Sequence, residues 1–445
     1  MKRKHIYSIL VISSFVFGTV SCNANGNVPS DLFTLPDFYN KTLKEAKLEV
    51  GTNILFETEN VPTSELIEGR ILSYANDLKA GDKVEKGTRV KVKVAKRSET
   101  AVSIDNEIVN YVNQINFITG PKGINSELLL NAGAGGTDLG IPFELPDKKM
   151  MLLYGDTFSG QNMQGFWNSN FMAITEDKNL SDGLTFSDVV TTDNGMIKPF
   201  FQGNHQKGNE NDPSVEVTKI PTGGISIGDD TYIFYMSIRY WGVAGSWNVN
   251  YNECLKATDN TYKNWLPVST LRWTENDLYY AGQIYPFNNP KDPSNIYFVS
   301  IPGGRNNGSV MFRVNKDKFE NRSEYEYLVG KSTWVKGDEG MSMLNQNPYY
   351  IMTPGVSEPS IMYSEYLDKF IYSTLKGSAI VFGVSENVEG PYKEIHQVLK
   401  GNDFPTLYGG FIHPNFTDSN GQRLYMQLSQ WTPIYNTSLV EVVLK

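Results

Sequence analysis

From about residue 114 to the C-terminus, short aromatic-rich strands recur between polar turns, and no segment has the spacing of a long amphipathic helix. Six of these strands are MLLYG, TYIFYMSIRYW, NIYFVSI, SVMFRV, FIYSTL and RLYMQLSQW. Several lead into a polar hairpin that closes on an aromatic residue, as in ITEDKNLSDGLTF and LKATDNTYKNW. Degenerate units of this kind favour radial repetition, by which a β-propeller protects its sheet edges. At roughly 65 residues per unit, about 330 residues predict an all-β, five-bladed β-propeller over 114–445, with a β-sandwich pair or a β-helix as alternatives.

The amino-acid composition limits the classes of binding partner and of catalytic chemistry that this chain can have. The 25 Tyr, 23 Phe and 39 Gly suit β structure, where aromatic residues pack on pleated surfaces and glycine serves turns. A net charge of −9 argues against a nucleic-acid partner, because binding a polyanion needs clustered Lys and Arg. With four His, two Cys and no HExxH, CxxC, GxSxG or Gly-rich phosphate motif, we expect no metal and no cofactor.

The N-terminus is typical of an export signal. Basic residues at positions 2–4 precede an apolar run over 6–20 that is too short to span a bilayer comfortably. The run ends in TVSC, which resembles a bacterial lipoprotein signal over 1–22 with an acylated Cys22; an ordinary secretory signal with a chance Cys is the alternative. This predicts an exported lipoprotein anchored at the periplasmic or cell-surface face, followed by a flexible tether over 23–33. Cys254 would then be a single, buried, inert thiol without a disulfide partner.

A compact α+β module is predicted over 34–97. The segment TLKEAKLEV fits a short helix capped by Thr42, with Leu43, Ala46 and Leu48 on its buried side. Strands are expected in NILFET, GRILSYAN and TRVKVKVAK. The alternation of Val with Arg or Lys in the last of these predicts a half-buried edge strand. Residues 98–113 form a polar linker to the next domain.

This module resembles a PASTA domain. The matching segments are LPDF at 35–38, TLKEA at 42–46, GRILS at 69–73 and AGDKVEKGT at 80–88. In other proteins such modules are associated with peptidoglycan or cell-wall contact, so the resemblance implies adhesion to the envelope. A simple spacer between the lipid anchor and the following domain is the alternative, since nothing in the segment forms an obvious ligand pocket.

Two aspartates with glycine neighbours bracket a predicted β-hairpin. The PDKK segment at 146–149 is typical of a turn, so 140–145 should pair antiparallel with 150–155. A turn centred on this segment sets Asp138 opposite Thr157 and makes Asp138 and Asp156 neighbours at the open end. Strict alternation would put diagonal neighbours on opposite faces. One bulged residue, at Gly135, Gly136 or Gly140, would put both on the same side.

Two carboxylates held close together at a strand end are what glycoside hydrolysis requires. One must stay protonated to assist the leaving oxygen, while the other stays ionised as a base or nucleophile. The alternative is that each aspartate only caps its own Gly-rich turn.

Other polar and aromatic residues are candidates for binding a sugar substrate. A Trp–Asn pair combines an aromatic plate for a sugar face with amides for its hydroxyls. Glu216 lies between two valines and could be solvated, or could enter the site as a third carboxylate that binds substrate or tunes the acid's pKa. Each residue alone is more often structural. The candidates are Glu216, Trp167, Asn168, Asn170, Trp247, Asn248, Glu358, Tyr408 and His413.

Six motifs occur in an order that is similar to one glycoside hydrolase family. They are GTDLG at 136–140, YGDTF at 154–158, WNSN at 167–170, IPTGG at 220–224, GGR at 303–305 and YGG at 408–410. Residues 114–445 thus resemble the domain once catalogued as unknown-function family 4185 and now grouped as glycoside hydrolase family 183. The resemblance implies a five-bladed β-propeller with endo-D-arabinofuranase activity on the α-linked D-arabinan of mycobacterial arabinogalactan and lipoarabinomannan. It carries the catalytic pair onto Asp138 and Asp156.

We therefore expect an exported, membrane-tethered endo-D-arabinanase. An inverting mechanism is expected, with Asp138 as general base and Asp156 as general acid, an order that the family pattern implies. Two alternatives remain: a non-catalytic glycan-binding propeller held at the envelope, and a glycosidase that acts on another furanoside such as L-arabinan.

Overall fold

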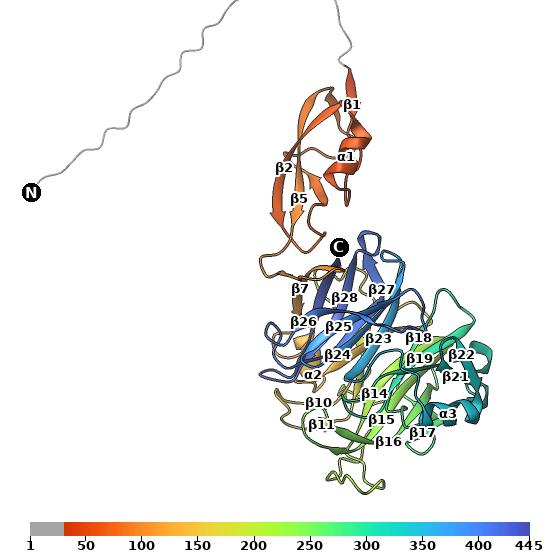
Figure 1. Cartoon of the computed structure of the whole chain (residues 1–445). Coiled ribbons are helices and arrows are strands. Elements are labelled where there is room, and N and C mark those ends of the chain that lie inside the picture. The colour runs from red at the N-terminus through yellow and green to blue at the C-terminus, as the bar shows by residue number, and fades with distance from the viewer. Residues whose placement is uncertain (1–30) are drawn as a thin grey trace, which may run out of the picture.

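The computed structural model describes residues 31–445. The predicted signal peptide, its Cys22 and most of the predicted tether therefore lie outside the described residues. A small N-terminal domain stands on a larger β-rich body, at the side where the C-terminus lies (Figure 1). Among the described helices, none has the length and apolar character needed to cross a lipid bilayer.

The small domain combines one helix with two small sheets. Helix α1 (Leu43–Val50) begins at Thr42, which forms with Glu45 the reciprocal capping pair that fixes a helix start. Ala46 and Val50 are buried one turn apart, whereas Leu48 is 77% exposed on the opposite face, so its predicted burial is wrong. One sheet pairs β1 (Leu32–Thr34) with β4 (Lys83–Glu85), and the other has the order β2 (Ile54–Pro62), β5 (Thr88–Lys96), β3 (Ile71–Tyr74).

Strand β5 is the central strand of its sheet, not the predicted edge strand. It pairs parallel with β2 and antiparallel with β3. Val90, Val92 and Val94 are buried, while Lys91 and Lys93 between them are half-buried. Alternation of apolar and charged residues indicates that one face of a sheet is covered. It does not show whether the strand pairs with one neighbouring strand or with two. Strand β1 includes the last two residues of the segment predicted as a flexible tether.

The larger body consists mainly of five antiparallel sheets that follow one another along the chain, which confirms the prediction of a mostly β structure. The first two sheets have the strand orders β13 (Asp188–Val189), β12 (Phe171–Thr175), β9 (Met150–Tyr154), β8 (Leu139–Glu144) and β14 (Thr218–Ile227), β15 (Asp230–Trp241), β16 (Trp247–Ala257), β17 (Trp265–Thr274). The third sheet has the strand order β18 (Gln283–Asn288), β19 (Asn295–Ile301), β20 (Val310–Asn315), β21 (Glu326–Gly330), β22 (Thr333–Lys336). The last two have the strand orders β23 (Val356–Ser364), β24 (Lys369–Lys376), β25 (Ala379–Ser385), β26 (Glu394–Lys400) and β27 (Leu407–Asp418), β28 (Arg423–Gln430), β29 (Asn436–Leu444), β7 (Val109–Phe117), β6 (Val102–Ser103).

Short elements complete the body. Strands β10 (Thr157–Phe158) and β11 (Trp167–Asn168) form a separate pair, and the α-helices are α2 (Ser126–Asn131) and α3 (Gly337–Gln346). All six strands read from the sequence are present, as β9, β15, β19, β20, β24 and β28.

One strand of each sheet faces the middle of the body. Strands β8, β14, β18, β23 and β27 contact one another in this order, and β27 in turn contacts β8. Strand β7 begins inside the predicted linker and pairs with the C-terminal strand β29, so the start and end of the body share one sheet (Figure 1). This arrangement brings the beginnings of distant strands to one place.

Candidate active site

The hairpin that carries the two aspartates forms as predicted, with its register shifted by one residue. Leu145 and Lys149 close a three-residue loop in which Lys148 is left-handed (φ 69°), so Glu144 pairs with Met150. Thr137, not Asp138, therefore meets Thr157, with their hydroxyl oxygens 2.7 Å apart. The left-handed Lys148 shortens the turn from the predicted four residues.

A bulge at Gly140 brings the aspartates to one side of the hairpin, as predicted. The register changes between Leu139 and Ile141, and both Leu139 (φ 69°) and Gly140 (φ 77°) are left-handed. Leucine rarely adopts this conformation, and such strain is common at functional sites. Asp138 then lies beside Gly155, where an added Cβ would be 2.4 Å from Asp138 Oδ1. Because Gly155 has no side chain, Asp138 can lie close to the backbone directly before Asp156.

The aspartates line a cavity of about 460 Å³ at the point where the five inner strands begin. Each inner strand places at least one residue near its start in the wall: Leu139 of β8, Ile220 of β14, Gln283 of β18, Glu358 of β23 and Tyr408 of β27. The far ends of the same strands line a larger cavity of about 850 Å³, which contains neither aspartate. The smaller cavity is therefore the candidate active site.

Asp156 is held by two hydrogen-bond donors. Trp167 Nε1 (2.8 Å) and Thr218 Oγ1 (2.6 Å) both donate to its Oδ1, which leaves Oδ2 available to carry a transferable proton. Burial raises the pKa of Asp156 to about 8; the negative charge of Asp138 adds to this, and the two donors oppose it.

Asp138 has the lower pKa of the pair. Tyr408 Oη donates to its Oδ2 at 2.8 Å, while its Oδ1 is buried without a hydrogen-bond partner. Burial raises the pKa of Asp138 to about 6, and the hydrogen bond from Tyr408 limits the rise. Near neutral pH, Asp156 is thus protonated while Asp138 is ionised, the division of labour that a general acid and a general base require.

An ion pair stands in the same cavity. Arg305 lies 2.9 Å from Glu358 Oε1, and Glu358 Oε2 is buried without a partner. Glu358 is left-handed (φ 49°), and its N–H donates to Gln283 Oε1 at 2.8 Å. Gln283 also donates to the carbonyls of Pro302 and Gly304, so it fixes both the Glu358 backbone and the loop that presents Arg305. One oxygen of the Glu358 carboxylate thus has no hydrogen bond within the described residues.

Aromatic side chains complete the wall. Trp247 and Tyr408 line the cavity as predicted, and the ring of each lies within 6 Å of the Arg305 guanidinium. Trp241 and Trp431, at the ends of β15 and β28, also line it and are 41% and 50% exposed. In the sequence, the segments that contain these two tryptophans predict only strands. Flat aromatic surfaces at a cavity mouth suit sugar faces.

The Trp167–Asn170 segment supports the site from behind the cavity wall. Trp167 is stacked on His205 with ring centroids 3.9 Å apart, so it positions Asp156 and offers no open platform on that face. Asn168 is a buried strand residue opposite Thr157. Asn170 uses its amide on three backbone groups, the carbonyls of residues 201 and 219 and the N–H of residue 200. Asn170 is therefore structural.

Three further candidates lie outside the cavity. Glu216 lies in the loop before β14 and is buried in a network with Lys219 (2.9 Å), Ser237 (2.7 Å) and Tyr251 (3.2 Å). Asn248 lies on β16 and lines a small neighbouring cavity. His413 is fully buried, and burial lowers its pKa to about 3, which makes it a neutral core residue.

Residues that the site-residue prediction omitted are Arg305, Thr218, Gln283 and Tyr435. Arg305 belongs to the GGR motif, which could have identified it as a site residue. No local sequence pattern distinguishes Thr218, Gln283 or Tyr435. Tyr435 lines the cavity and donates to the Asp156 carbonyl at 3.1 Å. Cys254 is buried, and burial raises the pKa of its thiol, as expected for an inert cysteine.

Comparison with known proteins places most of the larger body in one family. The profile of the family described as "Domain of unknown function (DUF4185)" matches residues 127–441. Two curated fungal proteins are similar: Notoamide biosynthesis cluster protein J' of Aspergillus versicolor is 28% identical over 316 residues, 67% of this chain and 82% of that protein. Notoamide biosynthesis cluster protein J of Aspergillus sp. (strain MF297-2) is 27% identical over 322 residues, 69% of this chain and 82% of that protein.

A solved structure shares the fold at low sequence identity, and another is more weakly similar. A Bacteroides ovatus ATCC 8483 protein provisionally described as a hydrolase aligns with a TM-score of 0.52 and 12% identity, over 75% of this chain and 90% of that chain. A native arabinanase of Bacillus subtilis aligns with a TM-score of 0.37 and 12% identity, over 69% of this chain and 96% of that chain. The first likeness concerns the fold alone, and the second is too weak for comparison.

Proposed function

This chain belongs to the DUF4185 family, and we propose that it is a glycoside hydrolase that cleaves within D-arabinan chains. The observation that carries the proposal is the buried aspartate pair, in which the pKa of Asp156 is about 8 and that of Asp138 about 6. Two neighbouring carboxyls with separated pKa values are the arrangement that glycoside hydrolysis uses.

In the proposed inverting mechanism, Asp138 deprotonates a water molecule that attacks the anomeric carbon. Asp156 donates its proton to the leaving glycosidic oxygen, so one C–O bond forms as the other breaks. Thr218 and Trp167 hold Asp156 through its other oxygen, which fixes the direction of its proton.

We further propose that the five sheets are the blades of a β-propeller. Consecutive inner strands contact one another, β27 contacts β8, and β7 joins the last sheet beside the C-terminal strand; all three features support a closed ring. A cavity at the start of the inner strands would then lie at one end of the central channel.

The D-arabinan substrate rests on the six motifs of the sequence, and the exposed Trp241 and Trp431 at the cavity mouth support a glycan polymer. Release of reducing ends from a panel of purified polysaccharides, including mycobacterial arabinogalactan and L-arabinan, tests this choice. Release from L-arabinan alone would show that the substrate is L-arabinan and not D-arabinan. Release from none of the polysaccharides would favour a glycan-binding protein.

The activity should depend on pH with a bell-shaped profile. Asp138 must be ionised, so kcat/KM rises as pH increases through about 6, and Asp156 must be protonated, so it falls as pH passes about 8. Thr218→Val removes a donor that lowers the Asp156 pKa and should move the alkaline limb to higher pH. Tyr408→Phe removes the donor to Asp138 and should move the acid limb to higher pH. Profiles of kcat/KM for the three proteins measure both shifts.

The two variants serve as controls for each other. If Thr218→Val moves the acid limb and Tyr408→Phe the alkaline limb, then Asp156 is the base and Asp138 the acid. Unchanged limbs in both variants would contradict the aspartates as the acid–base pair.

We propose that the protein is exported as a lipoprotein and that the small domain is a PASTA module that acts as a spacer or contacts the cell wall. Metabolic labelling with palmitate in a bacterial host should label the wild type, and Cys22→Ser should lose the label and leave the membrane fraction. Equal labelling of the two proteins would rule out Cys22 as the acylated residue.

A further inference from the structure

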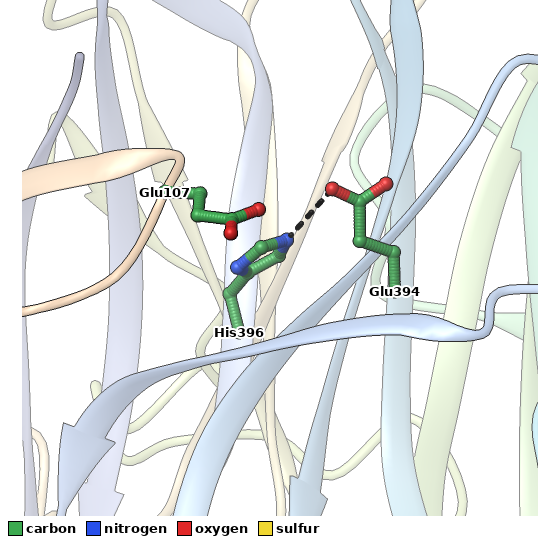
Figure 2. Close-up of side chains that lie close together, drawn as sticks. All are labelled: Glu107, Glu394 and His396. Carbon is green, nitrogen blue, oxygen red and sulfur yellow. Dashed lines mark ion pairs between the residues drawn. The ribbon is translucent and has the colours of Figure 1, made fainter.

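A second cluster of titratable side chains lies at the turn between β6 and β7, on the outside of the larger body. The turn brings Glu107 against strand β26, where Glu394 and His396 project from the neighbouring sheet (Figure 2). One potential ligand atom from each residue lies within 4.8 Å of the other two. Asn106 fixes the turn, because its side chain accepts from the N–H groups of Ile108 and Val109 and donates to the Gln397 carbonyl.

The buried imidazole nitrogen of this cluster has no hydrogen bond. The His396 side chain is 7% exposed, and its Nε2 lies 3.4 Å from Glu394 Oε1 without forming one. Protein N–H···O bonds span about 2.7–3.2 Å. Two ligands on a tetrahedral ion with bonds of about 2.0–2.1 Å lie about 3.3–3.4 Å apart, which is the spacing seen here. Figure 2 shows the ring directed between the two carboxylates.

We propose that Glu107, Glu394 and His396 bind one divalent transition-metal ion, with Zn²⁺ as the best match. An imidazole nitrogen with two carboxylate oxygens suits Zn²⁺ and leaves a fourth position for water, whereas Ca²⁺ and Mg²⁺ prefer oxygen ligands alone. Lys369 lies 3.7 Å from Glu394 Oε2, so the other oxygen of that carboxylate faces His396.

The ion would have a structural role. It would fasten the turn before β7 to β26 and so link the sheet that holds the larger body's first and last strands to the sheet before it. The sequence does not predict a metal, because it contains no motif that sets metal ligands at short spacing. Here Glu107 is brought to the other two ligands only by the fold.

Titration of untagged, chelator-treated protein with ZnCl₂ by calorimetry, together with thermal melting, tests the site. The wild type should bind one Zn²⁺, and its Tm should rise with the Zn²⁺ concentration because the ion binds the folded state. Glu107→Gln and Glu394→Gln should each weaken binding by at least about tenfold, the loss typical even for residues that support a metal ligand. Glu386→Gln, an exposed glutamate at the turn before β26, should bind as the wild type does.

Several outcomes would overturn the proposal. Absence of Zn²⁺ binding, or a Tm that does not respond to Zn²⁺, would reduce the cluster to a contact between His396 and Glu394. Binding of equal strength in the wild type and both glutamate variants would place the ion elsewhere. His396→Gln should also abolish binding; because His396 is buried and its replacement can disturb folding, the two exposed glutamates decide the result.

Discussion

Asp156→Asn and Asp138→Asn are each expected to lower the release of reducing ends from D-arabinan by about 10²–10⁴-fold, the usual contribution of one general acid or base. Asparagine keeps the shape of aspartate but can neither donate the proton that the leaving oxygen needs nor accept one from water. Both side chains line the same cavity and differ in pKa, so each variant should lose a different proton transfer of the single displacement step. Initial rates with purified variants measure the effect.

Asp147→Asn is the matched control, because Asp147 lies in the turn of the same hairpin and is exposed. It should retain wild-type activity. Full activity in Asp138→Asn and Asp156→Asn would refute the assignment of the catalytic pair. Proton NMR of the first product formed by the wild type would show the inverted anomer, and a retained anomer would make Asp138 a nucleophile.

Arg423→Met is expected to lower the free energy of unfolding by about 3–5 kcal/mol, the cost of leaving a buried charge without its partner. Arg423 is fully buried and lies 3.1 Å from Glu441 Oε1, and Glu441 is 2% exposed. Burial raises the pKa of Glu441 and Arg423 lowers it, so the variant leaves an unstable carboxylate in the sheet that holds β7 and β29. Urea denaturation followed by tryptophan fluorescence measures the loss.

Two companion variants make this result specific. Arg89→Met removes an exposed ion pair with Glu57 in the small domain and should cost only about 0–1 kcal/mol. Arg423→Met combined with Glu441→Gln removes the orphaned charge and should recover part of the stability. If Arg423→Met is no more destabilising than Arg89→Met, the buried pair does not stabilise the fold.

The arrangement of Asp138 and Asp156 could be predicted because it depends on one hairpin. The turn residues, the strand alternation and a glycine able to bulge all lie within about two dozen residues, where local backbone preferences decide the outcome. The predicted register was one residue off because the left-handed conformation of Lys148 is unusual for lysine. The bulge at Gly140 still placed both carboxyls in one cavity.

The substrate-binding candidates were predicted less well. Trp167 and Asn170 have side chains of a kind that can bind sugars. However, His205 covers one face of Trp167, and the amide of Asn170 is already bonded to three backbone groups. Trp431 has the same chemistry and lies in the cavity wall. Residue type shows what a side chain could bind, whereas its exposure depends on strands far away in the sequence.

By itself, the sequence determined the β-rich body, the capped helix of the small domain and the hairpin that joins the two aspartates, because periodicity, caps and turns act between near neighbours. Only the tertiary structure decided that β5 is central, that Arg305 and Glu358 face the same cavity as the aspartates, and that Glu107 meets His396. These contacts depend on the order and packing of sheets whose strands are separated by long stretches of chain, and no local pattern encodes that order.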